Sequence, residues 1–281
     1  MKKKWLKIGA LIVALLIILG ICWFANELVG NPISSWLANR TVEKHMEEVY
    51  GDTDFVVETV GFNFKDTDYY AHIKSPSSED SSFSLRIDMW GNLLMDTYED
   101  RVLSGRNTED RLYREYRALT DKVFESPSYP FSTFICYGKL WVGFTAPDME
   151  VGKELPDAGY VVLDEVVLDK QYDIRELGAL AGYLVVYVED EEVTIERAAE
   201  VLLELKQLFD KENVPFYAID FVLEYPRVPE GGNSKEGRVN VEGFLYSDIY
   251  EDGLVERIRI ANDELNAYYE EQDAKTKELI E

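Results

Sequence analysis

Histidine is the first residue type to examine for catalysis, and the chain contains only His45 and His72. Two histidines cannot build a multi-histidine zinc site, and the H-E-x-x-H motif of zinc hydrolases is absent. A Ser–His–Asp triad would need one of them beside a nucleophilic serine, yet the sequence has no G-x-S-x-G turn. Because no serine has a lysine three positions later, the S-x-x-K acyl-enzyme arrangement is absent as well.

Carboxylates are the other side chains that could do chemistry. They gather at Asp66 and Asp68, in the run 189–192, and at Asp248, Glu251 and Asp252. No cluster has the spacing of a calcium-binding loop, with its central glycine and terminal glutamate, so turns and a solvated charge run explain them. A glycosidase needs two carboxylates across a cleft, and this pattern leaves that alternative open.

The remaining polar features have structural interpretations. The glycine-containing stretch 232–238 lacks the terminal Lys-Ser/Thr of a phosphate loop and leads into a strand, which indicates a surface loop. His45 lies at the edge of an apolar helix face, and His72 lies on the polar side of a strand. Cys136 is interpreted as a buried strand thiol. The sequence therefore predicts no catalytic residue, no cofactor and no metal ligand.

The charge of the chain limits its partners. It has 54 acidic and 29 basic residues, a formal net charge of -25. Such a surface repels nucleic acid, because binding to a phosphate polymer depends on lysine and arginine contacts. The 46% of hydrophobic residues is still enough for a folded core. We therefore expect folded acidic domains that do not bind nucleic acid.

The stretch that organises the chain is the uncharged run 8–25, which follows a basic tail at 1–7 with four lysines. A helix of about 18 residues spans most of a hydrocarbon core about 30 Å thick, so the run predicts a transmembrane anchor that contacts the lipid bilayer. The lysines predict a cytosolic N-terminus. We thus expect a single-pass signal-anchor protein of the cell membrane, with extracytoplasmic C-terminal domains.

Two processed forms are alternatives to an uncleaved anchor. A secretory signal peptide could be cut between Ala25 and Asn26, although Trp23 occupies a position where a small residue is usual. A lipoprotein could be acylated on Cys22, although Ile21 is larger than the residue that normally precedes such a cysteine. The pattern favours the uncleaved anchor.

The periodicity beyond the anchor predicts two small α+β domains. In the first, 31–126, a helix to about Tyr50 precedes four strands and a second helix that begins near Asn107. Its clearest strand alternates apolar and polar residues from Phe83 to Met89, and Gly91-Asn92 fits the hairpin turn that follows. We expect an antiparallel sheet with helices on one side.

The second half of the chain is also predicted to contain both strands and helices, although its sequence does not repeat that of the first half. An extra strand and a linker are expected in 127–157, and a second α+β domain in 158–271. Within it, Asp173 is expected to cap a short helical turn, Thr194 is expected to begin a helix, and alternate residues of 217–225 share one strand face. The charged tail 272–281 completes the chain. Each domain is predicted to be an antiparallel sheet packed against helices.

Several short stretches carry a family resemblance. They are Asn31-Pro32, Phe62-Asn63-Phe64-Lys65, the stretch 75–80 leading into Phe83, Asp96-Thr97-Tyr98, and Asn107-Thr108 with Arg111. Together with Val214-Pro215-Phe216 and the strand after it, they resemble the YfjL-like family of membrane-anchored proteins from Gram-positive bacteria. The resemblance covers nearly the whole chain. It implies one membrane anchor and two small α+β domains of uncharacterised role, and it supplies no catalytic residue.

These observations leave two classes of function. The first is a non-catalytic module of the cell envelope that binds, senses or assembles, with an envelope or membrane protein as its partner. The second is an envelope hydrolase that uses carboxylates. A bare sheet face or an exposed groove would favour binding, and an apolar pocket with paired acids would favour the enzyme.

Overall fold

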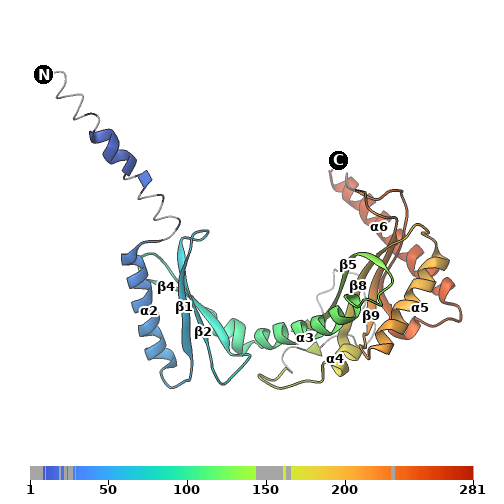
Figure 1. Cartoon of the computed structure of the whole chain (residues 1–281), viewed down its shortest axis with the longest axis horizontal. Coiled ribbons are helices and arrows are strands. Elements are labelled where there is room, and N and C mark those ends of the chain that lie inside the picture. Colours follow the sequence, from blue (N-terminus) through green and yellow to red (C-terminus); the bar gives the residue numbers. More distant parts are fainter. Residues whose placement is uncertain are drawn as a thin grey trace. The chain divides into compact units, whose positions relative to one another are not determined.

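The computed structural model (Figure 1) describes residues 9, 11–18, 20, 21, 24, 28, 30–143, 161–162, 166–228 and 232–280. The chain divides into two compact units, Met1–Thr108 and Glu109–Glu281, and the division falls within helix α3 (Arg106–Phe124). Each unit combines one main sheet with helices, which confirms the α+β class.

The prediction of a transmembrane helix over 8–25 is contradicted. Along the described part of the chain, no helix is both long enough and apolar enough to cross a membrane. The single-pass, signal-anchored location in the cell membrane, with extracytoplasmic domains, depended on that helix and is corrected with it. The basic tail 1–7 lies outside the described residues.

The first unit begins with helix α2 (Pro32–Tyr50). Asn31 caps it, because its side-chain oxygen accepts hydrogen bonds from the backbone N–H of Ile33 and Ser34 at 3.0 and 2.9 Å. Pro32 suits the first helical position, where no backbone donor is needed. Four strands follow and form one antiparallel sheet in chain order: β1 (Val56–Asn63), β2 (Asp68–Lys74), β3 (Ser82–Ile87) and β4 (Leu93–Asp96).

The core of the first unit lies between α2 and one face of this sheet. Alternation in β3 buries Phe83, Leu85 and Ile87, as the sequence predicts. The same alternation in β2 buries Tyr69, Ala71 and Ile73, and these side chains pack with Ala38 and Val42 of α2. Gly91 sits in the β3–β4 turn with a φ of 83°, a conformation that glycine adopts without strain.

Besides the short 3-10 helix Tyr246–Asp248, the second unit has nine helices and strands among the described residues beyond α3, and several match the predicted bounds closely. They are β5 (Ser132–Leu140), β6 (Val142–Gly143), β7 (Val161–Val162), α4 (Ile174–Ala181), β8 (Gly182–Glu189), α5 (Ile195–Lys211), β9 (Ala218–Glu224), β10 (Arg238–Leu245) and α6 (Leu254–Ile280). Asp173 caps α4, and the next helix, α5, begins with Thr194 as its N-cap residue, both as the sequence predicts. The Thr194 side chain also caps α5, since it accepts from the Arg197 N–H. Most of the predicted linker, 144–157, lies outside the described residues.

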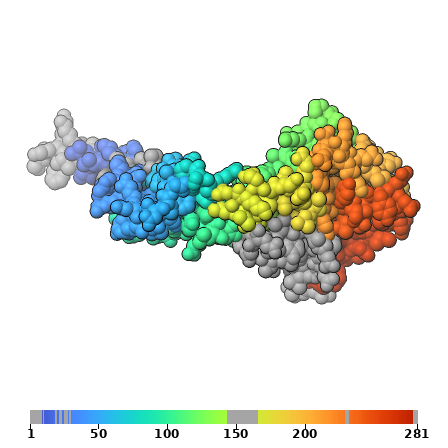
Figure 2. Space-filling model, turned by 90° about the horizontal axis from the view of Figure 1, so that it is seen from below, coloured from blue at the N-terminus to red at the C-terminus, as the bar shows by residue number. Residues whose placement is uncertain are grey.

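The prediction of an antiparallel sheet is wrong for the second unit, where the main sheet is mixed. Its order is β10-β9-β8-β5, and β8 and β9 run parallel while the other two pairs are antiparallel. The cause is the connection: β8 leads into α5 and returns as β9, and a strand–helix–strand crossover joins parallel strands. Helices α5 and α6 lie side by side in this unit (Figures 1 and 2). Their apolar faces, which include Leu202 and Ile258, pack in one core with Phe221 of β9.

Candidate functional site

The face of the first sheet that points away from α2 is polar, and we call it the open face. It is built by the second set of alternating side chains, because residues two apart on a strand share a face. From β2 these are Tyr70, His72 and Lys74, and their register partners on β3 are Arg86, Ser84 and Ser82. His72, Lys74 and Ser82 are exposed. This face is therefore available to a ligand.

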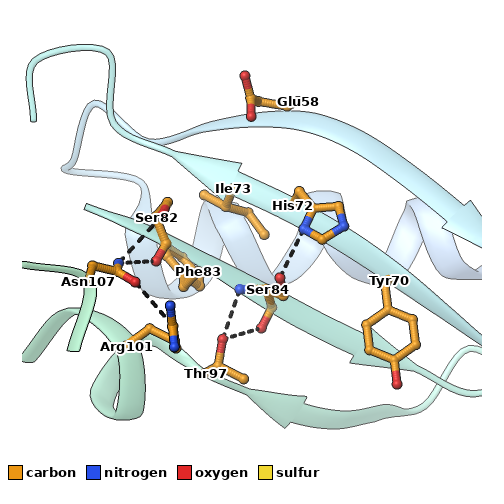
Figure 3. Close-up of a pocket in the computed structure, with 10 residues that line it drawn as sticks. All are labelled: Glu58, Tyr70, His72, Ile73, Ser82, Phe83, Ser84, Thr97, Arg101 and Asn107. Carbon is orange, nitrogen blue, oxygen red and sulfur yellow. Dashed lines mark hydrogen bonds between the residues drawn. The ribbon is translucent and has the colours of Figure 1, made fainter. Parts of the chain in front are cut away.

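The open face is hollowed into a pocket of about 440 Å³, which we call the open-face pocket (Figure 3). Its lining comes from β1, β2, β3, the residue after β4, the short helical turn Glu99–Leu103 and the start of α3. The lining residues are Glu58, Tyr70, His72, Ile73, Ser82, Phe83, Ser84, Thr97, Arg101 and Asn107. Eight of these ten side chains carry a hydrogen-bonding group, and the other two, Ile73 and Phe83, are apolar.

A chain of hydrogen bonds crosses the floor of the pocket. The Oγ of Ser84 lies 3.0 Å from Nδ1 of His72. The backbone N–H of Ser84 donates to Oγ1 of Thr97 at 2.9 Å, and that hydroxyl donates back to the Ser84 carbonyl at 3.1 Å. Figure 3 shows these three residues in a row across neighbouring strands. Thr97 thus extends the pairing of β3 beyond the end of β4 and fixes the position of Ser84.

Asn107 closes one end of the pocket. Its amide nitrogen donates to the carbonyls of Asp80 and Ser82 at 2.7 and 2.6 Å, and its amide oxygen accepts from Nε of Arg101 at 3.1 Å. Because all of the donating and accepting ends of this amide are engaged, its orientation is fixed. Asn107 therefore holds the start of α3 and the turn containing Arg101 against the edge of β3.

The charged groups of the open face are joined in pairs. Glu58 forms an ion pair with Lys74, and Arg86 donates from Nε to Asp68 at 2.6 Å. That hydrogen bond raises the pKa of the Arg86 guanidinium. Partial burial, and then the hydrogen bond from its hydroxyl to Asp66 at 2.9 Å, raise the pKa of Tyr70. Within each of these two ion pairs the charges cancel, although the whole chain carries -25.

Two arrangements that hydrolases use can be compared with the described residues of the pocket. A serine nucleophile needs a histidine whose other nitrogen is oriented by a third group. Among the described residues, Ser84 is the hydrogen-bond partner found for His72, and Figure 3 shows Glu58 projecting away from the imidazole. Glu58 is also the pocket's one carboxylate, so the lining does not supply the carboxylate pair of a glycosidase.

The residues singled out in the sequence lie elsewhere, with one exception. His45 is at the edge of the α2 core, as predicted, where its Nε2 lies 2.8 Å from Asp96. Asp96 also accepts from the hydroxyl of Tyr50 at 2.8 Å, and burial followed by this contact raises the pKa of Tyr50. Cys136 lies on β5, half-buried rather than buried. Only His72 belongs to the open-face pocket, on the exposed side of its strand as predicted.

The acidic clusters do not converge in the structure. No group of three or more histidine, cysteine or carboxylate side chains in the described ranges is arranged to hold a metal ion. Asp66 and Asp68 instead contact Tyr70 and Arg86, and Asp190 contacts Arg197 at 2.9 Å. These carboxylates serve local hydrogen bonding and ion pairing.

Sequence reasoning missed Ser84, Thr97 and Asn107 as members of a site. The alternation from Phe83 to Met89 already placed Ser84 on the polar side of its strand, and His72 was placed on the polar side of its own strand. What the sequence lacked was the register that sets His72 opposite Ser84. If the register had been known, the exposed polar residues that face each other on β2 and β3 would have predicted the site.

The fold and the pocket define a class of protein: two α+β units, the first with a sheet whose second face is open and hollowed. The chain belongs to the YfjL-like family, because the model of the YfjL-like N-terminal domain matches residues 2–97 and that of the YfjL-like C-terminal domain matches 115–259. No curated protein and no solved structure matches the chain significantly.

Proposed function

We propose that this protein is a non-catalytic binding module whose ligand is an uncharged, polar segment of a protein partner, held in the open-face pocket. The observation that carries the proposal is the hollowed polar face of the first sheet, which offers about 440 Å³ of space lined by hydroxyl, amide and imidazole groups. Both a sensor and an assembly factor would use such a surface to bind a partner. Which of these two roles the protein has depends on the identity of its partner.

The pairing of charges on the open face supports an uncharged ligand. Lys74 is neutralised by Glu58, and Arg86 by Asp68. A charged ligand would have to break one of these pairs or be buried beside it without a partner, and an unpaired buried charge is costly. Hydroxyl, amide and imidazole groups can both donate and accept, which matches the amide groups of a polypeptide.

The environment of Tyr70 favours a peptide over a sugar. A saccharide usually stacks on a free aromatic face, and Tyr70 is the aromatic ring on the open side of this pocket. The guanidinium of Arg86 already lies over that ring, 5.9 Å from its centroid, and the Tyr70 hydroxyl already donates to Asp66. The Tyr70 ring is therefore already engaged with Arg86 and lines the side of the pocket instead of offering a free face to a sugar.

Selection of a displayed library of random peptides on the full chain tests the proposal. We expect the enriched peptides to be rich in serine, threonine, asparagine and glutamine. Ser84→Trp should fill the pocket and weaken their binding by at least about tenfold, or about 1.4 kcal/mol. Lys44→Trp is the matched control, because the Lys44 side chain on α2 is 71% exposed and lies outside the pocket. Calorimetric titration of wild type and both variants measures the difference.

Two results would contradict this function. Equal binding of the enriched peptides to wild type and Ser84→Trp would place their site elsewhere on the chain. Binding of oligosaccharides on a glycan array, lost in Ser84→Trp, without enrichment of any peptide would replace the protein partner with a sugar.

A fluorophosphonate probe tests the hydrolase alternative at Ser84. We expect no labelling of Ser84 above the background of Ser84→Ala, because Ser84 is the hydrogen-bond partner found for His72 among the described residues, and a base needs a further group to orient it. Mass spectrometry of the peptide containing Ser84 measures the label, and a serine protease in a parallel tube verifies the probe. Labelling of Ser84 that disappears in His72→Ala would instead show that the protein is a serine hydrolase.

A further inference from the structure

Strand β1 (Val56–Asn63) is an edge of the first sheet. In the sheet order β1-β2-β3-β4, β2 is the partner found for β1 within the described chain. At eight residues, β1 is twice as long as β4, the other edge, which has four. A long edge strand presents a row of backbone donors and acceptors with which another strand can pair.

Only part of this edge has the features that prevent pairing. A register shift between Val57 and Thr59 makes a bulge at Glu58, and bulges and charges both discourage edge pairing. From Thr59 to Asn63 the register with β2 is regular, and this segment contains neither a charge nor a proline. Thr59 and Gly61 are exposed. We call residues 59–63 the open edge.

The open edge is symmetric in residue type about Gly61. Thr59 and Asn63 are polar, Val60 and Phe62 are apolar, and a Cβ added to Gly61 would meet nothing within 4 Å. We propose that a second copy of this chain pairs with the open edge, antiparallel, with Gly61 opposite Gly61 on a two-fold axis. Each interface strand then presents the same surface to its partner, as a two-fold dimer requires.

This register matches side chains on both faces of the extended sheet. Val60 pairs opposite Phe62 of the second copy, on the side where these residues pack against the buried core. Thr59 pairs opposite Asn63 of the second copy, on the open face, so that a polar residue faces a polar one. The Asn63 side chain itself is held in its own turn, where it donates to Asp66 at 2.9 Å and accepts from the Lys65 N–H at 3.0 Å. A one-residue slip would place apolar side chains opposite polar ones, so the pattern selects one register.

Charge and area set the strength of this dimer. The open edge is uncharged, so two acidic chains can meet there without like charges facing each other. Pairing of five residues per chain buries much less than the roughly 1,600 Å² of a standard interface, which makes the dimer weak. The net charge of -25 on each copy adds repulsion that salt screens. Association should therefore strengthen with salt, whereas a dimer held by ion pairs would weaken.

Cysteine cross-linking of the full chain tests the register. Directly opposite residues on antiparallel strands have Cα atoms about 4.5–5.5 Å apart, within reach of a disulfide. Gly61→Cys should form an intermolecular disulfide at least about tenfold faster than Thr59→Cys, which is not opposite itself in this register. Mixing Thr59→Cys with Asn63→Cys should restore the fast reaction. The parent chain, with Cys22 and Cys136, gives the background rate.

Analytical ultracentrifugation tests the association itself. We expect a reversible dimer at roughly 100 µM protein, more populated at roughly 0.5 M salt than at roughly 0.05 M. Val60→Lys should abolish it, and Leu94→Lys on the exposed part of β4 should leave it unchanged; circular dichroism confirms that both variants fold. A monomer at every concentration and salt, or a Gly61→Cys rate equal to the parent background, would overturn the proposal.

Discussion

Leu85→Asp is expected to unfold the first unit while the second unit stays folded. Leu85 has no exposed surface and packs in the core between the first sheet and α2. A carboxylate at this position loses its water without gaining a partner, at a cost of about 5 kcal/mol. Because a domain of this size is stable by roughly 5–15 kcal/mol, the substitution removes most or all of that margin.

Hydrogen exchange with mass spectrometry measures this result unit by unit. Peptides from 31–108 should lose protection in Leu85→Asp, and peptides from 109–281 should keep it. Ser82→Asp is the matched control, since Ser82 lies on the same strand but is exposed on the open face. Unchanged protection of the first unit in Leu85→Asp would show that the two faces of β3 are assigned the wrong way round.

The first sheet was predictable because its strands bury one face only. In β3 the alternation of Phe83, Leu85 and Ile87 with polar residues specifies both the strand and its buried side. In the second unit, β8 is buried along nearly all of its length, so its sequence is apolar on both faces. Such a strand carries no alternation, and whether it pairs parallel or antiparallel with β9 depends on the α5 crossover, which no local pattern specifies.

The stretches that carry the family resemblance have structural roles. Asp96 joins His45 and Tyr50 of α2 to the end of β4, Thr97 binds both backbone groups of Ser84, and Asn107 fixes the start of α3. Arg111 is nearly fully buried and donates to Glu115 and to the Lys170 carbonyl at 3.0 and 2.9 Å. Residues of this kind identify the fold. Thr97 and Asn107 of these stretches also line the pocket. The pocket was less predictable, because His72 and Ser84 are common polar residues that only strand register sets opposite each other.

The largest effect in the second unit is expected at Tyr116. Its side chain has no exposed surface, and its hydroxyl donates to the Pro215 carbonyl at 2.9 Å. The ring lies directly against Gly178 of α4, where an added Cβ would come within 2.6 Å of Tyr116 Cε2. A glycine on α4 thus allows the helix to pack closely on this ring. Tyr116 consequently joins α3, α4 and the segment before β9 within the second unit.

Tyr116→Ala should therefore destabilise the second unit by about 3–5 kcal/mol, because the neighbours of a buried aromatic ring cannot collapse fully into the space it leaves. Tyr116→Phe keeps the ring and leaves the Pro215 carbonyl without its donor, which should cost about 1 kcal/mol. Tyr113→Ala, on the exposed side of the same helix, should change stability by less than about 0.5 kcal/mol. Urea unfolding, monitored by hydrogen exchange of peptides from 109–281, ranks the three variants by the free energy of unfolding of the second unit. Equal losses for Tyr116→Phe and Tyr116→Ala would mean that the hydroxyl contact, and not ring packing against α4, holds these elements together.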